Sequence, residues 1–344
     1  MSPAIETLSS EMELGEPQRF RNMVLWPLFC SQDKGPDYLS LTEAMTAGLL
    51  TITEVSAHGS VPEVKVVNRA EVPVLLLDGE ELVGAKQNRT LNTTILVKEK
   101  TEMVVPVSCT EAGRWSHAGG VWAQSAGSPS ARFDDSGMVV HRRVRAEKSR
   151  TVLHNLEASR GFRSDQGRVW SLIDEVAAEA DTAPPTGALR DVARHSHVRL
   201  SEYTAAFPLQ SNQKGMLVFI DGRPAGLDVI SRSQPYTTLH SKLLNSYAFD
   251  ALLRRPGVEA EPNQDQATGF VKRVLECQEQ EYKSVGLGTD HRLRGRGVIG
   301  SALVVDDAVV HLSMFADDSG AQGTRTDDRM ASLAQRRRFR YWSG

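Results

Sequence analysis

A strand-turn-strand pattern recurs along the chain and limits the fold more than any other feature of the sequence. Apolar or alternating segments flank Asp78-Gly79, Asp221-Gly222 and Asp306-Asp307. Such pairs are typical of the tight turns that join antiparallel strands. The pattern therefore predicts hairpins at residues 74–83, 216–230 and 298–315, and it suggests related β modules in the two halves of the chain.

Other short segments extend this prediction over the first hundred residues. Residues 40–50 begin with a Ser or Thr cap and an early Glu and carry apolar residues at helical spacing, which predicts one short helix. Residues 1–20 are polar with little periodicity, which suggests a flexible or loosely docked arm. Further strands are expected at residues 23–29, 61–67, 93–97 and 103–107.

The middle of the chain changes character. Residues 122–138 are rich in Ser, Gly, Asp and Ala and are expected to form a long surface loop. Residues 139–158 are highly charged, which fits an exposed helix. Ser164-Asp165-Gln166 is expected to cap an amphipathic helix that packs on the sheet, and helices are also expected at 187–207 and 238–254. The predicted fold class is α+β, a single domain over residues 21–315 with a helical segment at 139–207, followed by a loop and a basic-aromatic tail at 316–344.

Composition narrows the classes of function. The chain has 344 residues, 40% of them hydrophobic, and a formal charge of −3 from 40 basic and 43 acidic residues. A chain of this length and composition can bury a substantial core. Its small net charge argues against nucleic-acid binding, except for a contact through the basic-aromatic tail. Three widely spaced cysteines fit a reducing compartment, and we find neither a signal peptide nor a long apolar segment. We expect a cytoplasmic protein that does not bind membranes.

The polar residues of the stretch from Val72 to Val97 form the first candidate site. Glu80 and Glu81 could act as general acid or base, although alternation along a strand places them on opposite faces. The alternative is a solvated face with cross-strand ion pairs. Groups suited to holding an anion are Lys86, Gln87, Asn88, Arg89 and Asn92.

A second candidate site follows at residues 106–117. Cys109 could be a nucleophile with Glu111 or His117, although a cysteine at a strand end is more often a buried small residue. Arg114 and Trp115 are better suited to pair with phosphate and to stack on a ring, or to stabilise the loop.

Helical spacing gives the third candidate site. Lys242 and Ser246 lie one turn apart, as a base and a nucleophile would, although a solvated helix face is the simpler interpretation. His311 lies in an apolar strand and is expected to be a satisfied core histidine. No Cys, His or carboxylate spacing matches a standard zinc or calcium site, and no glycine-rich phosphate loop joins a strand to a helix, so neither a metal nor a cofactor is predicted.

Four blocks of the sequence resemble a known family: LLLDGEELVGAKQNRTLNTTILV, PVSCTEAGRWSH, DGRPAGLDVISRSQPYTTLHSKLLNSYAFDAL and GVIGSALVVDDAVVHLSMF. Their order is similar to that of the domain family named for its association with ADP-ribosylglycohydrolases and rhodanese-phosphatases, over about residues 15 to 315. The resemblance implies a single α+β domain that works near NAD or ADP-ribose metabolism. The positions that match the family's motifs are Glu80, Glu81, Gln87, Asn88, Arg89, Asn92, Cys109, Glu111, Arg114, Trp115, Lys242, Ser246 and His311. The chain departs from the pattern at Ile230-Ser231-Arg232.

Three hypotheses about function follow. The first is a domain that binds a nucleotide-like or ADP-ribose-like anion, with or without catalysing a reaction on it. Proteins of ADP-ribose metabolism would be its partners. The second is a non-enzymatic interaction or scaffold domain whose polar blocks are internal hydrogen-bond networks. The third is a thiol enzyme that uses Cys109. Whether the chain catalyses any reaction is left open by the sequence.

Overall fold

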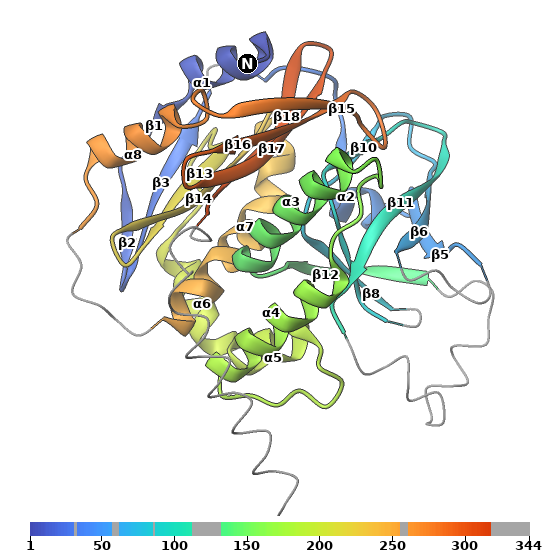
Figure 1. Ribbon diagram of the computed structural model, residues 1–344, viewed down its shortest axis with the longest axis horizontal. Helices are drawn as coiled ribbons and strands as arrows, with labels where there is room; N and C mark the ends of the chain where they lie inside the picture. Colours follow the sequence, from blue (N-terminus) through green and yellow to red (C-terminus); the bar gives the residue numbers. More distant parts are fainter. Residues whose placement is uncertain (31–32, 57–61, 85–86, 112–131, 255–260, 318–344) are drawn as a thin grey trace, which may run out of the picture.

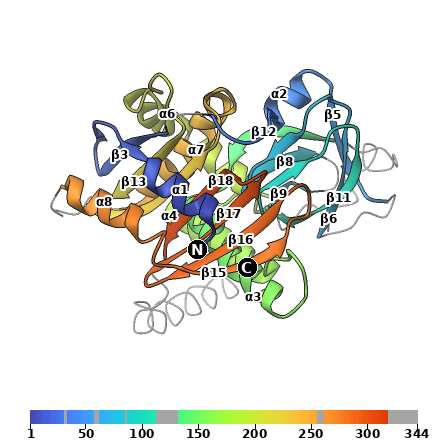
Figure 2. The same cartoon turned by 90° about the horizontal axis from the view of Figure 1, so that it is seen from above.

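Two β structures flank a central layer of helices (Figure 1). The computed structural model describes residues 1–344 except 31–32, 57–61, 85–86, 112–131, 255–260 and 318–344. In Figure 1 a large sheet lies on the left, α3 (Arg142–Glu157) and α7 (Ser233–Leu253) lie in the middle, and a barrel lies on the right. Figure 2 shows the same separation of sheet and barrel from above. The α+β prediction is confirmed.

The large sheet is antiparallel and has nine strands. The turns of its two predicted hairpins have left-handed backbone at both central residues, with φ of 51° and 74° at Asp221 and Gly222 and of 51° and 56° at Asp306 and Asp307. This conformation matches the twist of the flanking strands. The order is β1 (Glu13–Leu14), β3 (Met23–Phe29), β13 (Gly215–Ile220), β14 (Arg223–Ile230), β18 (Ala308–Ala316), β17 (Val298–Val305), β16 (Thr289–Gly295) and β15 (Gln278–Lys283), with β2 (Gln18–Phe20) beside β3.

The other strands form a closed barrel and a small sheet. The barrel order is β11 (Glu102–Cys109), β6 (Glu63–Asn68), β5 (Leu50–Glu54), β12 (Arg132–Val139), β8 (Glu80–Gly84) and β9 (Arg89–Leu91). The small sheet has the order β10 (Ile95–Val97), β7 (Val74–Leu76) and β4 (Leu39–Ser40).

The predicted hairpin at Asp78-Gly79 is wrong, because its two limbs belong to different sheets. β7 pairs with β10 and β4, whereas β8 pairs with β9 and β12. The turn instead packs on a helix: Gly79 has φ +84°, and an added Cβ would lie 2.9 Å from the Arg145 side chain. A side chain at this position would therefore be strained and would also clash with α3.

The predicted surface loop at 122–138 is also partly wrong. Residues 122–131 lie outside the described part, but residues 132–139 form β12, which pairs with β5 and β8. The polar residues that suggested a loop lie where the register shifts, between Asp135 and Val139. A bulge of this kind re-aims side chains, and Asp135 turns toward α7.

The helices differ from the predictions mainly at their ends. Ser40 forms the predicted capping box with Glu43, and Asp165 caps α4 through the Arg168 amide. The single helix predicted at 187–207 is divided at Ser196 into two. The arm predicted at 1–20 forms a helix with Ile5 fully buried, and two short strands. The remaining helices are α1 (Pro3–Glu11), α2 (Leu41–Thr46), α4 (Gln166–Glu179), α5 (Leu189–His195), α6 (His197–Ala206) and α8 (Gln264–Lys272).

Helix α3, predicted to be exposed, is instead buried between the sheet and the barrel. Arg142, Arg145 and Lys148 are all buried, with Arg145 and Lys148 at 0% exposure. Acidic residues distant in sequence, chiefly Asp228 and Asp250, pair with the two arginines. Charged side chains are found inside a protein when such partners compensate them. The charged residues of this helix therefore form buried ion pairs and do not face solvent.

Three apolar cores hold these layers together. One lies between the sheet and the central helices, one lies between the other face of the sheet and α1 and α8, and one fills the barrel. Among the described residues, no helix is both long and apolar enough to cross a membrane.

Candidate functional site

The first group of predicted site residues lies inside the barrel. The pairing of β11 with β9 sets Cys109 opposite Arg89, and both side chains have 0% exposure. The Arg89 guanidinium donates to Gln87 Oε1 at 3.0 Å and to Cys109 Sγ. Glu54 completes the group, with its carboxylate 3.8 Å from Arg89 Nη2. The partners of Arg89 are thus all side chains inside the barrel.

The environment of Cys109 is unsuited to nucleophilic attack. Burial raises the pKa of its thiol above the ordinary value, although the Arg89 charge opposes this shift. The thiol also lies 3.1 Å from Gln87 Oε1, to which it can donate. A protonated, enclosed thiol is a poor nucleophile. Its side-chain partners are Arg89 and Gln87 instead of the predicted Glu111, and His117 lies outside the described residues.

Lys242 and Ser246 do not form the predicted nucleophile and base. Lys242 Nζ donates to Glu80 Oε1 at 2.8 Å and to both oxygens of Asp135 at 2.8 and 2.9 Å. Ser246 Oγ instead donates to the Val140 carbonyl at 2.6 Å. Both residues are buried, so the solvated-face alternative is wrong as well. Lys242 ties α7 to the barrel through two carboxylates.

Glu81 points away from Glu80, as alternation along β8 predicted. Its Oε1 accepts from Thr110 at 2.7 Å, and burial raises the pKa of its carboxyl to about 7. Nearby, Gln87 Nε2 donates to the Glu111 carbonyl at 3.0 Å, and the Asn88 amide donates to the Glu111 carboxylate at 3.3 Å. These motif residues therefore bond one another across neighbouring strands.

A third buried group links the barrel, α3 and the large sheet. Arg145 donates to both oxygens of Asp228, at 3.0 and 2.6 Å, and holds the pKa of that carboxyl at about 2 against the effect of burial. His311 lies 3.2 Å from Asp228 and 2.7 Å from Thr94 Oγ1. The prediction of a satisfied core histidine is confirmed.

The motif reaches one open cavity, and it does so through Asn92 and Ser108. Asn92 Oδ1 accepts from Ser108 at 2.7 Å, and its Nδ2 donates to the Phe162 carbonyl at 3.1 Å. The Ser108 hydroxyl also hydrogen-bonds the hydroxyl of Ser164. The side chain of Gln166 bonds both the amide and the carbonyl of Cys109, at 2.8 and 2.9 Å. Strand β11, together with Asn92 directly after β9, thus holds residues 162–166, where the connection from α3 enters α4.

We call the hollow beside this segment the α3–α4 cavity. It has a volume of about 380 Å³, and it is lined by Thr151, His154, Asn155, Arg160, Arg163, Ser164 and Asp165.

Local hydrogen bonds fix the shape of the α3–α4 cavity. Asn155 Nδ2 donates to the Arg163 carbonyl at 2.7 Å, and the Arg160 amide donates to the Asn155 carbonyl at 2.7 Å. The Asp165 amide donates to Thr151 Oγ1 at 3.3 Å. The backbone of the segment is therefore bonded to the last turns of α3, while the two arginine side chains remain exposed.

The charges of this cavity suit an anion. Arg160 and Arg163 line it, and neither guanidinium forms a hydrogen bond or ion pair with any described residue. Asp165 supplies one negative charge and caps α4 through its bond to the Arg168 amide, at 3.1 Å. Two unpaired arginines at one concave site can bind a phosphate or carboxylate group in bidentate fashion.

None of the predicted site residues in the described part of the chain lines this cavity. Lys86, Arg114 and Trp115 lie outside the described residues, and the other predicted residues are part of the internal networks. Sequence analysis missed Arg160 and Arg163, although the capping signal at Ser164-Asp165 marked the start of α4 beside them. The available signal was the pair of arginines five and two residues before the Asp165 cap of α4.

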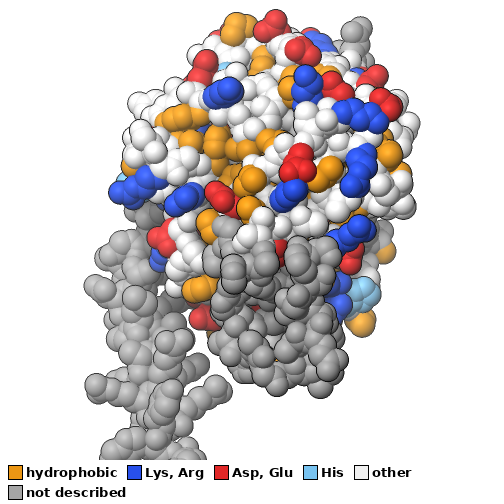
Figure 3. Space-filling model, turned by 90° about the vertical axis from the view of Figure 1, so that its right-hand side faces the viewer, with side chains coloured by type: hydrophobic (Ala, Val, Ile, Leu, Met, Phe, Trp, Pro, Cys, Tyr) orange, Lys and Arg blue, Asp and Glu red, His pale blue; other side chains and the backbone are white. Residues whose placement is uncertain are grey.

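Two other surfaces have fewer features of a binding site. A cavity of about 50 Å³ lies between α1 and β18, lined mostly by apolar side chains with the Glu11 and Lys34 pair at its edge. On the barrel side of the molecule, acidic and basic side chains are interspersed over the coloured surface (Figure 3). That arrangement gives no large field of one sign over that surface.

Comparison with known proteins identifies the family. No curated protein and no solved structure matches the chain. One family model matches residues 11–315, which include the barrel, the central helices and the large sheet. The chain belongs to the ARG and Rhodanese-Phosphatase-superfamily-associated Protein domain family.

Proposed function

We propose that this chain binds a small phosphate-bearing anion, of the nucleotide-like or ADP-ribose-like class, in the α3–α4 cavity. The observation that carries the proposal is the pair Arg160 and Arg163, which line the cavity and have no partner among the described residues. Elsewhere in the chain buried arginines are paired with carboxylates, as Arg145 is with Asp228. The two cavity arginines are therefore available for a ligand.

The size and polarity of the cavity support this class of ligand. Its volume of about 380 Å³ is at the lower end of small-molecule sites, which measure roughly 300–1,000 Å³. The lining is polar, with Asp165 and Asn155 offering groups that could hydrogen-bond ribose hydroxyls. The family name, which refers to association with ADP-ribosylglycohydrolases, favours a ligand of ADP-ribose metabolism, where we also place its partner proteins.

The proposal assigns binding and no reaction. Glu80, Glu81 and Cys109, the residues first expected to be catalytic, are buried and line neither cavity described above. Their role in the proposal is to hold the barrel strands that position the cavity wall. We place the protein in the cytoplasm, in keeping with three free cysteines.

A second candidate function is a non-enzymatic interaction or scaffold domain. The observation in its favour is that the motif side chains bond one another inside the core, as those of Glu81, Gln87 and Arg89 do with Thr110 and Cys109. Such networks specify a unique packed structure without any ligand.

Thermal unfolding with a ligand panel separates the two functions. ADP-ribose, ADP, NAD and inorganic phosphate would each be added to the full chain at millimolar concentration. A ligand that binds only the native state at 100 times its Kd stabilises it by about 2.7 kcal/mol, which raises the midpoint by several degrees. We expect such a shift with ADP-ribose or ADP. No shift with any of the four would favour the scaffold function.

A further inference from the structure

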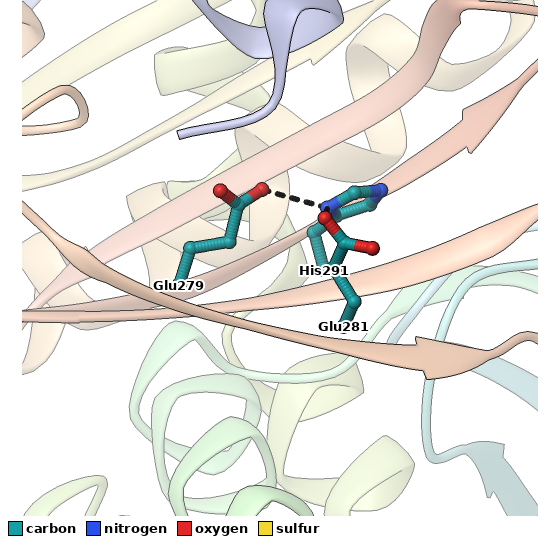
Figure 4. Close-up of side chains that lie close together, drawn as sticks. All are labelled: Glu279, Glu281 and His291. Atoms are coloured by element: carbon teal, nitrogen blue, oxygen red, sulfur yellow. Dashed lines mark hydrogen bonds and ion pairs between the residues drawn. The ribbon is translucent and has the colours of Figure 1, made fainter.

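A mixed cluster of two carboxylates and an imidazole lies at the β15 edge of the large sheet, and none of its residues lines the α3–α4 cavity. Glu279 and Glu281 are on β15 and His291 is on β16. The strands pair with Glu281 opposite His291 and with Glu279 two residues along the same strand. Because side chains alternate along a strand, all three project from one face of the sheet. Figure 4 shows them pointing toward one another.

Both carboxylates approach the same ring nitrogen. His291 Nδ1 lies 2.7 Å from a Glu279 oxygen and 3.9 Å from a Glu281 oxygen. One nitrogen can share only one hydrogen, so it can bond only one of the two carboxylates. The Glu281 carboxylate therefore has no bond to this nitrogen while Glu279 holds its hydrogen, whereas a metal ion could bind all three groups at once.

We propose that Glu279, Glu281 and His291 form a binding site for a divalent transition-metal ion of the zinc class. The three donor atoms lie within 4.8 Å of one another. Imidazole nitrogen with carboxylate oxygen suits zinc and its neighbours better than magnesium or calcium, which take oxygen donors almost exclusively. The site goes beyond the proposed anion binding and does not depend on it.

The spacing of the donors fits such an ion with small side-chain rotations. Zinc bonds of about 2.0–2.2 Å in tetrahedral geometry place neighbouring donors about 3.3 Å apart. The two observed separations from Nδ1, 2.7 and 3.9 Å, lie on either side of that value. The side chains of Glu279 and His291 are 10% and 5% exposed, whereas that of Glu281 is 63% exposed. Two ligands are thus held by the sheet, and the third faces solvent, where water would complete the coordination.

Two cations compete with the metal for this site. The amino group of Met1 lies 3.4 Å from the second oxygen of Glu279, and a proton on His291 would pair with the first. A metal ion that binds His291 must therefore take the place of its bond to Glu279 and compete with the amino group of Met1 for the carboxylate. The donors come from two strands, which is why spacing along the sequence did not reveal them.

Zinc titration of the full, metal-free chain tests the site. Zn²⁺ alone would be added at pH 7.5 in competition with a chromogenic chelator, and we expect one ion per chain. Glu281→Gln changes an exposed side chain and should preserve the fold while weakening binding at least tenfold, and His291→Ala should abolish binding. His197→Ala removes an exposed histidine of α6 and serves as the matched control.

The outcomes are decisive in either direction. Loss of binding in Glu281→Gln and His291→Ala, with the control unchanged and all variants folded by circular dichroism, supports the site. Failure of the wild-type chain to bind one Zn²⁺, or equal binding by the wild type and Glu281→Gln, overturns it. If His291→Ala does not fold, the Glu281→Gln comparison alone decides.

Discussion

The hydroxyl of Ser108 hydrogen-bonds the hydroxyl of Ser164, 56 residues further along the chain. Ser108 is at the end of a barrel strand, within the second motif block, and Ser164 lines the α3–α4 cavity. This contact connects the family's motif to the cavity wall. If the α3–α4 cavity binds the proposed anion, this contact would let motif residues that do not line the cavity affect binding there.

Replacing Ser108 with Ala should therefore weaken ligand binding as well as stability. The change removes the bonds to Asn92 and Ser164 and should cost about 1–2 kcal/mol of unfolding free energy, measured by urea denaturation. We also expect a roughly 3- to 10-fold weaker affinity for ADP-ribose in calorimetric titration. Ser201→Ala is the control, because Ser201 is exposed and bonds only within its own helix. If Ser108→Ala binds ADP-ribose as tightly as the wild type does, the contact between Ser108 and Ser164 has no influence on binding in the cavity.

Lys242→Met should destabilise the chain strongly. The change leaves Glu80 and Asp135 without their shared cation in the interior, where removal of one partner typically costs about 3–5 kcal/mol. The matched control is Lys65→Met, which removes an exposed pair with Glu102 and should cost less than about 1 kcal/mol. Urea denaturation at pH 7 measures both. Similar losses in the two variants would contradict the assignment of Lys242 as an internal link.

Glu81 should make the stability of the chain depend on pH near neutrality. Its pKa is raised in the folded state to about 7, so the folded protein holds the proton more tightly than the unfolded chain. The stabilisation that comes from this raised pKa is complete below the ordinary glutamate pKa and is lost as pH rises through about 7. The expected total is about 3 kcal/mol, because each tenfold change in proton affinity is worth about 1.4 kcal/mol.

Glu81→Gln provides the comparison, since glutamine has no proton to lose. Unfolding free energies of the wild type and the variant would be measured from pH 5 to pH 8. As pH rises, the wild type should lose stability relative to the variant. The difference should level off above pH 8. A difference independent of pH would show that Glu81 titrates normally. The groups that act on this carboxyl are Thr110, Ser136, Arg190 and Glu111.

Cys109 should resist alkylation in the native chain. It has 0% exposure, and burial raises the pKa of its thiol. Iodoacetamide at pH 7.5 should leave it unmodified in the folded protein and modify it fully in urea, as measured by peptide mass spectrometry. Rapid modification of native Cys109 would revive the thiol-enzyme hypothesis.

The sequence predicted the parts of the fold that depend on local signals. The turns at Asp221-Gly222 and Asp306-Asp307 form as expected, because their conformation is set by two residues. The cap at Ser40 is likewise local. At Asp78-Gly79 the same signal failed, because the two limbs pair with strands distant in sequence, β7 with β10 and β8 with β12.

The sequence could not reveal which charged residues are buried. Arg145 and Lys148 looked solvent-exposed because their partners Asp78 and Asp228 are far away along the chain. Several of the motif residues bond one another in the interior, as Arg89 does with Gln87 and Cys109, and this bonding depends on strand pairing that the sequence does not show. Arg160 and Arg163 carry no motif of their own, and only the folded arrangement of α3 and α4 gathers them at one cavity.

The most direct test of the account is calorimetric titration of ADP-ribose into the full chain and into an Arg160→Ala/Arg163→Ala variant. Both arginines are exposed, so the variant should fold as the wild type does. Arg199→Ala, which removes an exposed arginine of α6, is the matched control. We expect saturable binding by the wild type and the control, and an affinity at least 100-fold weaker in the double variant. Equal affinities in all three proteins would contradict the assignment of the α3–α4 cavity as the anion site.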